Sequence, residues 1–481
     1  MSDAYSDLDA TSQADLVRRK KVSPRELVDA AIARIEKLNP ELNAVIIPLF
    51  EKARALADSR DLPDGPFRGV PFVLKDLVSA SAGDPNHNGM QFLKKHRFVG
   101  PADSTIITRF RAAGLVIVGR TNAPELGLAG TTEPLAYGPA HNPWNPAHST
   151  GGSSGGSAAC VAARLVPAAG ASDGGGSIRI PASECGIVGL KPTRGRISLG
   201  PLAGEFWHGM ATEGVVSLSV RDSAALLDTI AGPMPGDPYF APPPPRPFAA
   251  EVGQAPGRLR IGLMTREPTN RRPLHPECVK AVESTGRLLE SLGHHVEASH
   301  PSAYDEAEMM SHFQTLVDAH SAQAMDMIGP LVGREIGPDD VEPYTWRFVE
   351  DGRRITARQY ITAAEWLQSW SRRMASWWAE GHDLLLTPTI SEPPPMLGDL
   401  GGPTGEPKKK WLRNLEVIPF TPAFNVTGQP GISLPLHWTP EGLPVGIHLV
   451  APYAREDLLV RVAAQLENAA PWAGRKPPLC A

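Results

Sequence analysis

Two serines, each set inside a cluster of glycines, are the residues of this chain whose types and spacing suggest chemistry. Ser153 belongs to the run GGSSGG and Ser177 to the run GGGS, and the two are 24 residues apart. A glycine-rich run is most often a flexible linker, a tight turn or a phosphate cradle. A serine hydroxyl in such a run becomes a strong nucleophile only when a neighbouring base removes its proton.

Several familiar glycine-rich sites do not fit these runs. No lysine follows them at the spacing of a GxxxxGK[ST] phosphate loop, and no acidic partner stands where a GxGxxG dinucleotide site needs one. A flexible linker is disfavoured because GGSSGG leads directly into the apolar run SAACVAARL. No histidine stands out as the base of a Ser-His-Asp triad, and we interpret His141 and His148 as surface or packing residues.

A neutral lysine is another base that can activate a serine, and Lys75 is the candidate. It ends the apolar run VPFVL and is followed by Asp76. Burial lowers the pKa of a lysine by up to several units, which would leave its amine free to accept a proton near neutral pH. Taken alone, Lys75 fits a surface lysine at a strand end better, because lysines are rarely fully buried.

The segment at residues 151–198 resembles the signature block of the amidase signature family. The resemblance extends over nearly the whole chain, through GVPFVLKDL, GRTNAPELG, NPWNP, FNVTGQPGISLP and PVGIHLV. It implies a Ser-cisSer-Lys triad made of Lys75, Ser153 and Ser177, with a cis peptide bond before Ser153. Ser177 would attack the carbonyl carbon of an amide, Ser153 would relay the proton to neutral Lys75, and water would hydrolyse the acyl-enzyme.

The resemblance also implies supporting roles for residues around the triad. Backbone N–H groups near the nucleophile would form an oxyanion hole. Most family members have Thr or Ile where this chain has Gly174, which should loosen that loop. The expected oxyanion-hole residues are Gly174, Gly175, Gly176 and Ser177, the expected structural supports are Ser154, Asp173 and Arg179, and the expected substrate contact is Gly127.

The elements that must position these residues alternate between strands and helices, which indicates an α/β fold. Ser23, Pro24 and Glu26 predict a capped helix that Asn39 and Pro40 stop. The resemblance implies the amidase signature fold, a large mixed twisted β-sheet covered by helices on both faces, in a single domain with a helical insertion. Strands are expected at 43–47, 70–75, 115–119, 258–264, 294–299, 383–390, 431–436 and 444–450, and helices at 104–114, 276–292, 455–468 and over much of 303–382.

The whole chain, residues 1–481, is expected to be one amidase signature domain. Its parts would be a signature core with the catalytic residues at 64–233, a Pro-rich connection at 234–257, and a helical insertion with a lid at 303–410. The lid would lie over the substrate pocket, because residues 391–410 have the Pro/Gly-rich composition of a mobile loop.

Composition excludes several classes of partner. A net charge of −5 gives no basic footprint for nucleic acid or for an anionic membrane, and no apolar run approaches the ~20 residues of a membrane span. The four cysteines are far apart and lack zinc spacing, so we expect free thiols, no metal and no cofactor. The sequence thus favours a cytoplasmic enzyme of small molecules, and it is compatible with a homodimer.

The favoured function is hydrolysis of amide C–N bonds in linear, cyclic or aryl amides, and in carbamates or urethanes. The tryptophan-rich insertion favours bulky, uncharged substrates, although the tryptophans fit plain helix packing equally well. The alternative is the A subunit of a tRNA-dependent glutamine amidotransferase, and the acidic charge balance disfavours it. A catalytically silent binding module is disfavoured because all three triad residues are present.

Overall fold

The computed structural model describes residues 5–400 and 406–481, and its centre is one mixed β-sheet. Across these residues the sheet has eleven strands, and its neighbours are partly parallel and partly antiparallel. Their order is β1 (Val45–Pro48), β3 (Val116–Thr121), β2 (Pro71–Lys75), β4 (Ala168–Asp173), β6 (Thr212–Ser217), β5 (Val188–Lys191), β10 (Gly431–Trp438), β11 (Pro444–Val450), β9 (Leu384–Pro388), β7 (Arg260–Leu263) and β8 (His295–Ala298).

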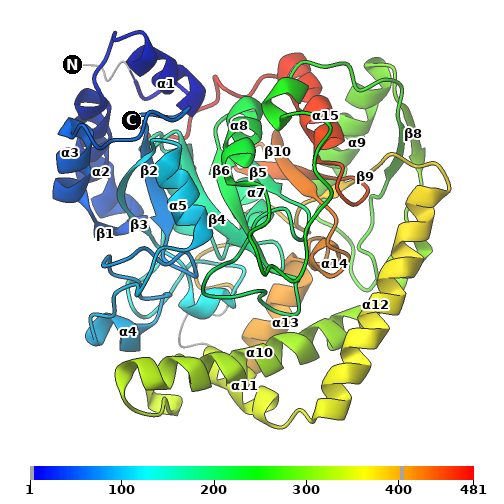
Figure 1. Cartoon of the computed structure of the whole chain (residues 1–481). Coiled ribbons are helices and arrows are strands. Elements are labelled where there is room, and N and C mark those ends of the chain that lie inside the picture. Colours follow the sequence, from blue (N-terminus) through cyan, green and yellow to red (C-terminus); the bar gives the residue numbers. More distant parts are fainter. Residues whose placement is uncertain (1–4, 401–405) are drawn as a thin grey trace.

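Helices cover both faces of the sheet, and strands in its first half contribute residues to two different cores (Figure 1). On β2, Phe72 and Leu74 belong to one core and Val73 to the other. The first face is covered by α1 (Ala10–Arg18), α5 (Thr105–Ala112), α8 (Val220–Ile230), α9 (Pro276–Ser291) and α15 (Glu456–Ala469). The second face is covered by α2 (Pro24–Leu42), α3 (Phe50–Asp58), α6 (Gly155–Ala162) and α7 (Arg179–Cys185). The expected fold is confirmed.

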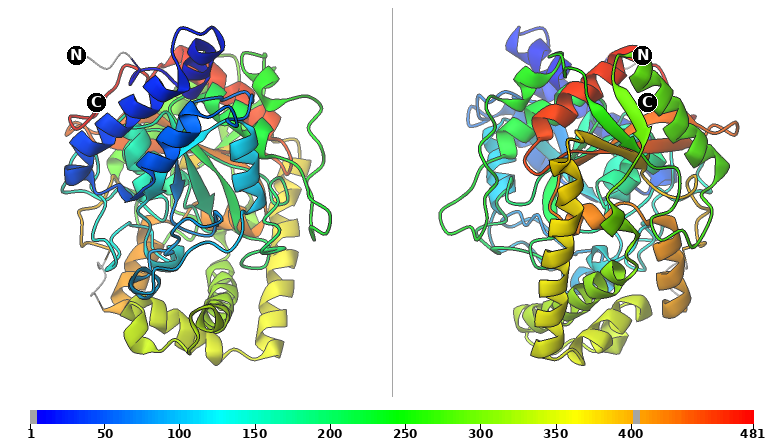
Figure 2. Two further views of the ribbon diagram at one scale, coloured as in Figure 1. Left: turned by 60° about the vertical axis from the view of Figure 1, so that its left-hand side comes forward. Right: turned by 90° about the vertical axis from the view of Figure 1, so that its right-hand side faces the viewer.

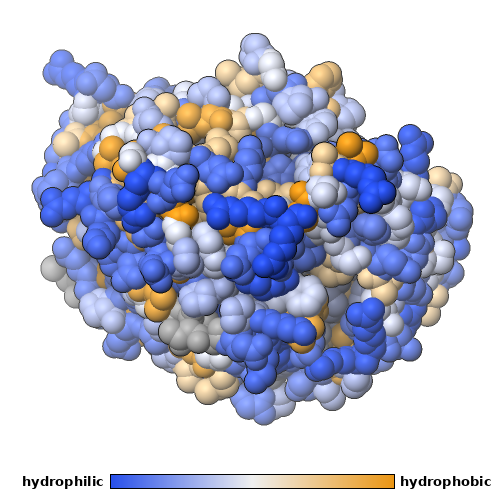
Figure 3. Space-filling model, turned by 90° about the horizontal axis from the view of Figure 1, so that it is seen from below, coloured by the Kyte–Doolittle hydropathy of each residue, from blue (hydrophilic) through white to orange (hydrophobic). Residues whose placement is uncertain are grey.

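A helical layer lies below the sheet in Figure 1, and Figure 2 shows it from two further sides. It packs around its own core, which includes Trp370 and Trp377. Seen from below, its outer face is mostly hydrophilic with scattered apolar side chains (Figure 3). Its helices are α10 (Glu308–Val332), α11 (Pro343–Arg353), α12 (Ala357–Ala379), α13 (Pro407–Val417) and α14 (Pro422–Val426), and the short α4 (Gln91–Lys95) lies nearby.

The expected lid at 391–410 falls partly outside the described residues, because it includes 401–405. Residues 391–400 are irregular and are tied to the chain near Ser149, whose N–H donates to the carbonyl of Pro395 at 2.8 Å. Residues 407–410 form the first turn of α13. A lid at this place therefore stays a prediction.

The expected end of the first strong helix is wrong. Helix α2 begins at the predicted Ser23 capping box but continues through Pro40 to Leu42. Pro40 lies in the last turn, so the bond that its missing N–H would make to the Glu36 carbonyl is lost only at the end of the helix, and Asn43 ends the helix in the left-handed conformation. The Asn39 side chain accepts from the N–H groups of Ala44 and Val45 and so anchors the chain that follows.

In the described part of the chain, helices of sufficient length are too polar to cross a lipid bilayer.

Candidate active site

The site lies where three neighbouring strands end or begin. Lys75 is the last residue of β2, Asp173 is the last residue of β4, and Glu213 is the second residue of β6. Because β2 and β4 are parallel and β6 is antiparallel to β4, all three positions meet at one edge of the sheet. Ser153 and Ser177 sit in the loops that lead into α6 and α7 at the same edge.

Lys75 is buried and contacts two serines. Its side chain is 1% exposed, and Nζ donates to Ser153 Oγ at 2.7 Å and to Ser172 Oγ at 2.9 Å. Burial lowers the pKa of Lys75 to about 7, although the charges of Asp173 and Glu213 act in the opposite direction. The peptide bond between Gly152 and Ser153 is cis. A lysine with this pKa can serve as a base near neutral pH.

Ser177 is partly exposed and lines the same cavity as Ser153. Within the described residues no hydrogen bond joins the two hydroxyls directly. Catalytic contacts are often long in a ligand-free enzyme and shorten when substrate is bound. The structure therefore brings Lys75 and Ser153 into contact and sets Ser177 on the cavity that Ser153 lines.

Two cavities meet at Ser177, and Gly127 and Trp207 also line both of them. Gly127 has φ +70°, and a Cβ there would lie 3.0 Å from Ser153 Oγ, so a side chain would crowd the junction. The first cavity runs toward α10, α11 and α13. The second holds Ser153, Ser172 and Glu213.

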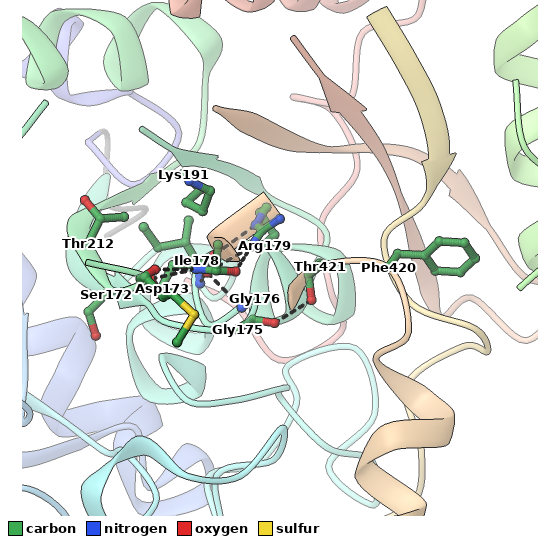
Figure 4. A network of polar contacts seen from close by, with 12 residues as sticks. Ser172, Asp173, Gly175, Gly176, Ile178, Arg179, Lys191, Thr212, Phe420 and Thr421 are labelled. Atoms are coloured by element: carbon green, nitrogen blue, oxygen red, sulfur yellow. Dashed lines mark hydrogen bonds and ion pairs between the residues drawn. The ribbon is translucent and has the colours of Figure 1, made fainter. Parts of the chain in front are cut away.

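The nucleophile loop is held by one buried carboxylate, that of Asp173 (Figure 4). It accepts from the backbone N–H of Gly176 at 2.7 Å and of Ile178 at 3.1 Å, and it pairs with Arg179 at 2.9 Å. Burial alone would raise the pKa of Asp173, but the charge and hydrogen bonds of Arg179, with help from Asn425, hold it well below its usual range. Asp173 is thus an ionised anchor of the loop.

The expected oxyanion hole needs one correction. The N–H of Gly176 donates to Asp173 Oδ1, so it is already occupied and cannot stabilise a substrate oxygen. Across residues 5–400 and 406–481, the N–H groups of Gly174, Gly175 and Ser177 have no hydrogen-bond partner. These three donors remain available beside the nucleophile, where an oxyanion would form.

The other expected site residues have structural contacts. Ser154 Oγ donates to the carbonyl of Ser172 at 3.2 Å. A Cβ at Gly174 would lie 2.8 Å from the Trp207 ring, so Trp207 takes the space that a larger residue at position 174 would need. Glycine at position 174 therefore leaves room for the Trp207 ring, which packs against the nucleophile loop there.

Three further residues of the site were not expected from the sequence: Ser172, Trp207 and Glu213. Ser172 directly precedes the expected Asp173. Successive side chains of a strand point to opposite faces, so the position of Ser172 in β4 indicates that it lies on the face opposite to Asp173. Trp207 and Glu213 carry no local signal. In the part of the chain that the structure describes, no group of three or more His, Cys, Asp or Glu side chains is arranged to hold a metal ion.

Replacing Asp173 by asparagine should strongly destabilise the protein. The change removes the charge that Arg179 needs and leaves a guanidinium buried without its partner, which typically costs ~3 kcal/mol or more. The free energy of unfolding, measured by urea titration, checks this. Asp58→Asn is the matched control, because Asp58 pairs with Arg25 at the surface, and it should change stability far less. Equal losses in the two variants would contradict the anchoring role.

Comparison with known proteins identifies relatives over nearly the whole chain. The family model described as Amidase matches residues 26–460. The chain is 45% identical to 6-aminohexanoate-cyclic-dimer hydrolase of Paenarthrobacter ureafaciens, over 98% of this chain and 96% of that protein. A solved structure of 6-aminohexanoate cyclic dimer hydrolase superposes with a TM-score of 0.95 at 44% identity, covering 98% and 99% of the two chains.

Two solved structures are similar at lower identity. A bacterial aryl acylamidase of the amidase signature family has a TM-score of 0.87 at 27% identity, covering 97% of this chain and 99% of its own. The A subunit of the glutamyl-tRNA(Gln) amidotransferase from Thermotoga maritima has a TM-score of 0.80 at 25% identity, covering 99% and 98%. The amidotransferase alternative is therefore the more distant one.

Proposed function

The chain belongs to the amidase family and is a hydrolase of amide carbon–nitrogen bonds, and from this premise we propose that Lys75, Ser153 and Ser177 carry the reaction. The observation that supports the proposal most directly is the 2.7 Å contact between the buried amine of Lys75 and the hydroxyl of Ser153. It joins a base of suitable pKa to a hydroxyl that lines the cavity and can pass a proton on.

In the proposed mechanism Ser177 Oγ attacks the amide carbonyl. Its proton moves to Ser153 Oγ while the proton of Ser153 moves to Lys75 Nζ, so that lysine becomes an ammonium. The N–H groups of Gly174, Gly175 and Ser177 stabilise the negative carbonyl oxygen. Return of the proton through Ser153 lets the amine leave, and water then hydrolyses the acyl-enzyme by the same route.

The first cavity supports a substrate with an uncharged, apolar acyl group. Its described lining carries no charged side chain. The two amide side chains in its wall are occupied by the protein itself. Asn414 accepts from Gly130 N–H at 2.8 Å and donates to the Lys410 carbonyl, and Gln314 accepts from Trp411 at 2.9 Å. The remaining wall is largely hydrophobic: Ile180, Met310, Phe313, Val317, Phe348 and Leu415.

We propose linear, cyclic and aryl amides of this kind as substrates, with carbamates and urethanes as further members of the class. The cyclic amide named in the relatives fits the description because it has no free charge. Cytoplasmic location, a homodimer and a lid at 391–410 stay predictions.

A matched pair of nitroanilides tests the acyl cavity. The hexanoyl anilide should have a kcat/KM at least ~100-fold above that of the analogue ending in a carboxylate, because burying an unpaired carboxylate costs several kcal/mol. Release of nitroaniline measures both. Met310→Lys places a half-buried ammonium in the wall and should narrow or reverse the preference. Equal rates on the two anilides with the parent protein would refute an apolar acyl site.

A further inference from the structure

Glu213 is a buried carboxyl that the mechanism above does not use. It is 2% exposed and lines the second cavity together with Ser153 and Ser177. In the pairing of β4 with β6, its Cα is the partner of Ser172. Side chains of directly opposed residues lie on the same side of a sheet, so the carboxyl stands beside the Ser172 hydroxyl.

The Ser172 hydroxyl is also a partner of the proposed base. Lys75 Nζ donates to Ser172 Oγ at 2.9 Å, which brings the lysine nitrogen next to the strand pair that holds Glu213. The Ser79 hydroxyl, from the loop after β2, donates to Glu213 Oε1 and fixes the carboxyl on that side. A single serine therefore separates a buried amine from a buried carboxyl.

The other charged groups that face this pair have partners of opposite charge. Arg120, from β3, is the second cation near Glu213, and it is bound to Asp76 at 3.2 Å. Asp173, from β4, is the anion with the larger effect on Lys75, and it is bound to Arg179 at 2.9 Å. In the described site, Lys75 and Glu213 are thus the two charged groups that have no other partner of opposite charge.

The titration of the two groups agrees with this geometry. Burial raises the pKa of Glu213 to about 7, against the hydrogen bond from Ser79 and the charges of Lys75 and Arg120. Burial lowers the pKa of Lys75 to about 7, against the charges of Asp173 and Glu213. Both groups change charge over the same pH range, so their titrations are linked.

We propose that Glu213 is a positioning residue for the proton on Lys75: its carboxylate stabilises the ammonium that forms when Lys75 accepts the serine proton, and so makes the buried lysine a stronger base. This role rests on the proposed triad. Without a nearby anion, burial would favour the neutral amine so strongly that Lys75 would accept the proton poorly. Glu213 lets one lysine be neutral at rest and still accept a proton during acylation.

The test uses the full-length protein and the rate at which a fluorophosphonate labels Ser177, measured from pH 5 to pH 9. Labelling requires activation of Ser177 but no particular amide substrate. Glu213→Gln keeps an oxygen that accepts from Ser79 and removes the charge. We expect the midpoint of the rise in labelling rate with pH to fall by about one pH unit, because Lys75 loses the carboxylate that stabilises its ammonium. One pH unit corresponds to a tenfold change in the acid dissociation constant of Lys75. The plateau rate should fall about tenfold.

Glu467→Gln is the control, since Glu467 on α15 also has a pKa raised to about 7 by burial but lies outside both cavities. It should leave the midpoint unchanged. If Glu213→Gln fails to fold, Glu213→Asp retracts the charge and should give a smaller shift in the same direction. A Glu213 variant with a parental midpoint overturns the inference while the triad stands. A Lys75→Arg protein that is labelled at the parental rate overturns the triad instead.

Discussion

Ser177→Ala should abolish amide hydrolysis and leave the fold intact. Among the described residues, the substitution removes the one hydroxyl that borders both cavities beside the free N–H donors. The loop should keep its shape, because Asp173 holds it through the backbone of Gly176 and Ile178 and not through the Ser177 side chain. Loss of a covalent nucleophile typically costs ~10⁴-fold or more in kcat. Nitroaniline release measures it, and mass spectrometry of the fluorophosphonate adduct reports the labelled residue.

Ser223→Ala is the matched control for this variant. Ser223 is a buried serine of α8 that is hydrogen-bonded to Ser217, away from both cavities, and its loss should leave the rate near that of the parent. Adduct formation on a Ser177→Ala protein would identify another nucleophile.

Lys75→Arg should be almost as damaging. A guanidinium keeps its proton throughout the working range of an enzyme, so it cannot accept one from Ser153. The parent protein should gain activity as pH rises through about 7, since only the neutral amine is active, and should reach a plateau in mildly alkaline buffer. Rates of hydrolysis between pH 5 and pH 9 test both statements.

Lys191→Arg provides a stringent comparison. Lys191 is also buried with a pKa lowered to about 7 by burial, but it donates to the carbonyl of Pro192, whereas Lys75 donates to the hydroxyl of Ser153. Its replacement should leave the midpoint of the pH profile in place. If Lys75→Arg hydrolysed amides and Lys191→Arg did not, the base would have been assigned to the wrong lysine.

The sequence predicts most of the fold because its signals are local or belong to a long signature. The Ser23 capping box begins α2 as expected, and the continuous apolar run of β2 places residues in both cores. The end of α2 is missed because the pair Asn39-Pro40 is interpreted as a stop, whereas Pro40 lies within the last turn and the helix continues to Leu42.

The site is predictable only as far as its motif extends. The burial of Lys75 goes against the average behaviour of lysine, and only the resemblance to a family points to it. Glu213 and Trp207 lie outside the matched motif. Glu213 reaches the site through the register between β4 and β6, and no local pattern specifies the register of strands that lie about forty residues apart.

The contact between Asn425 and Asp173 has a consequence for the synthesis of the protein. The Asn425 amide donates to Asp173, and Thr421 Oγ1 donates to the Gly175 carbonyl, so α14 completes the support of the nucleophile loop. These residues leave the ribosome about 250 positions after Ser177. At the usual ~5–20 residues per second, a nascent chain carries Lys75, Ser153 and Ser177 for roughly ten seconds or longer before that support arrives. We therefore expect the nucleophile loop of the growing polypeptide to lack this support until α14 has been made.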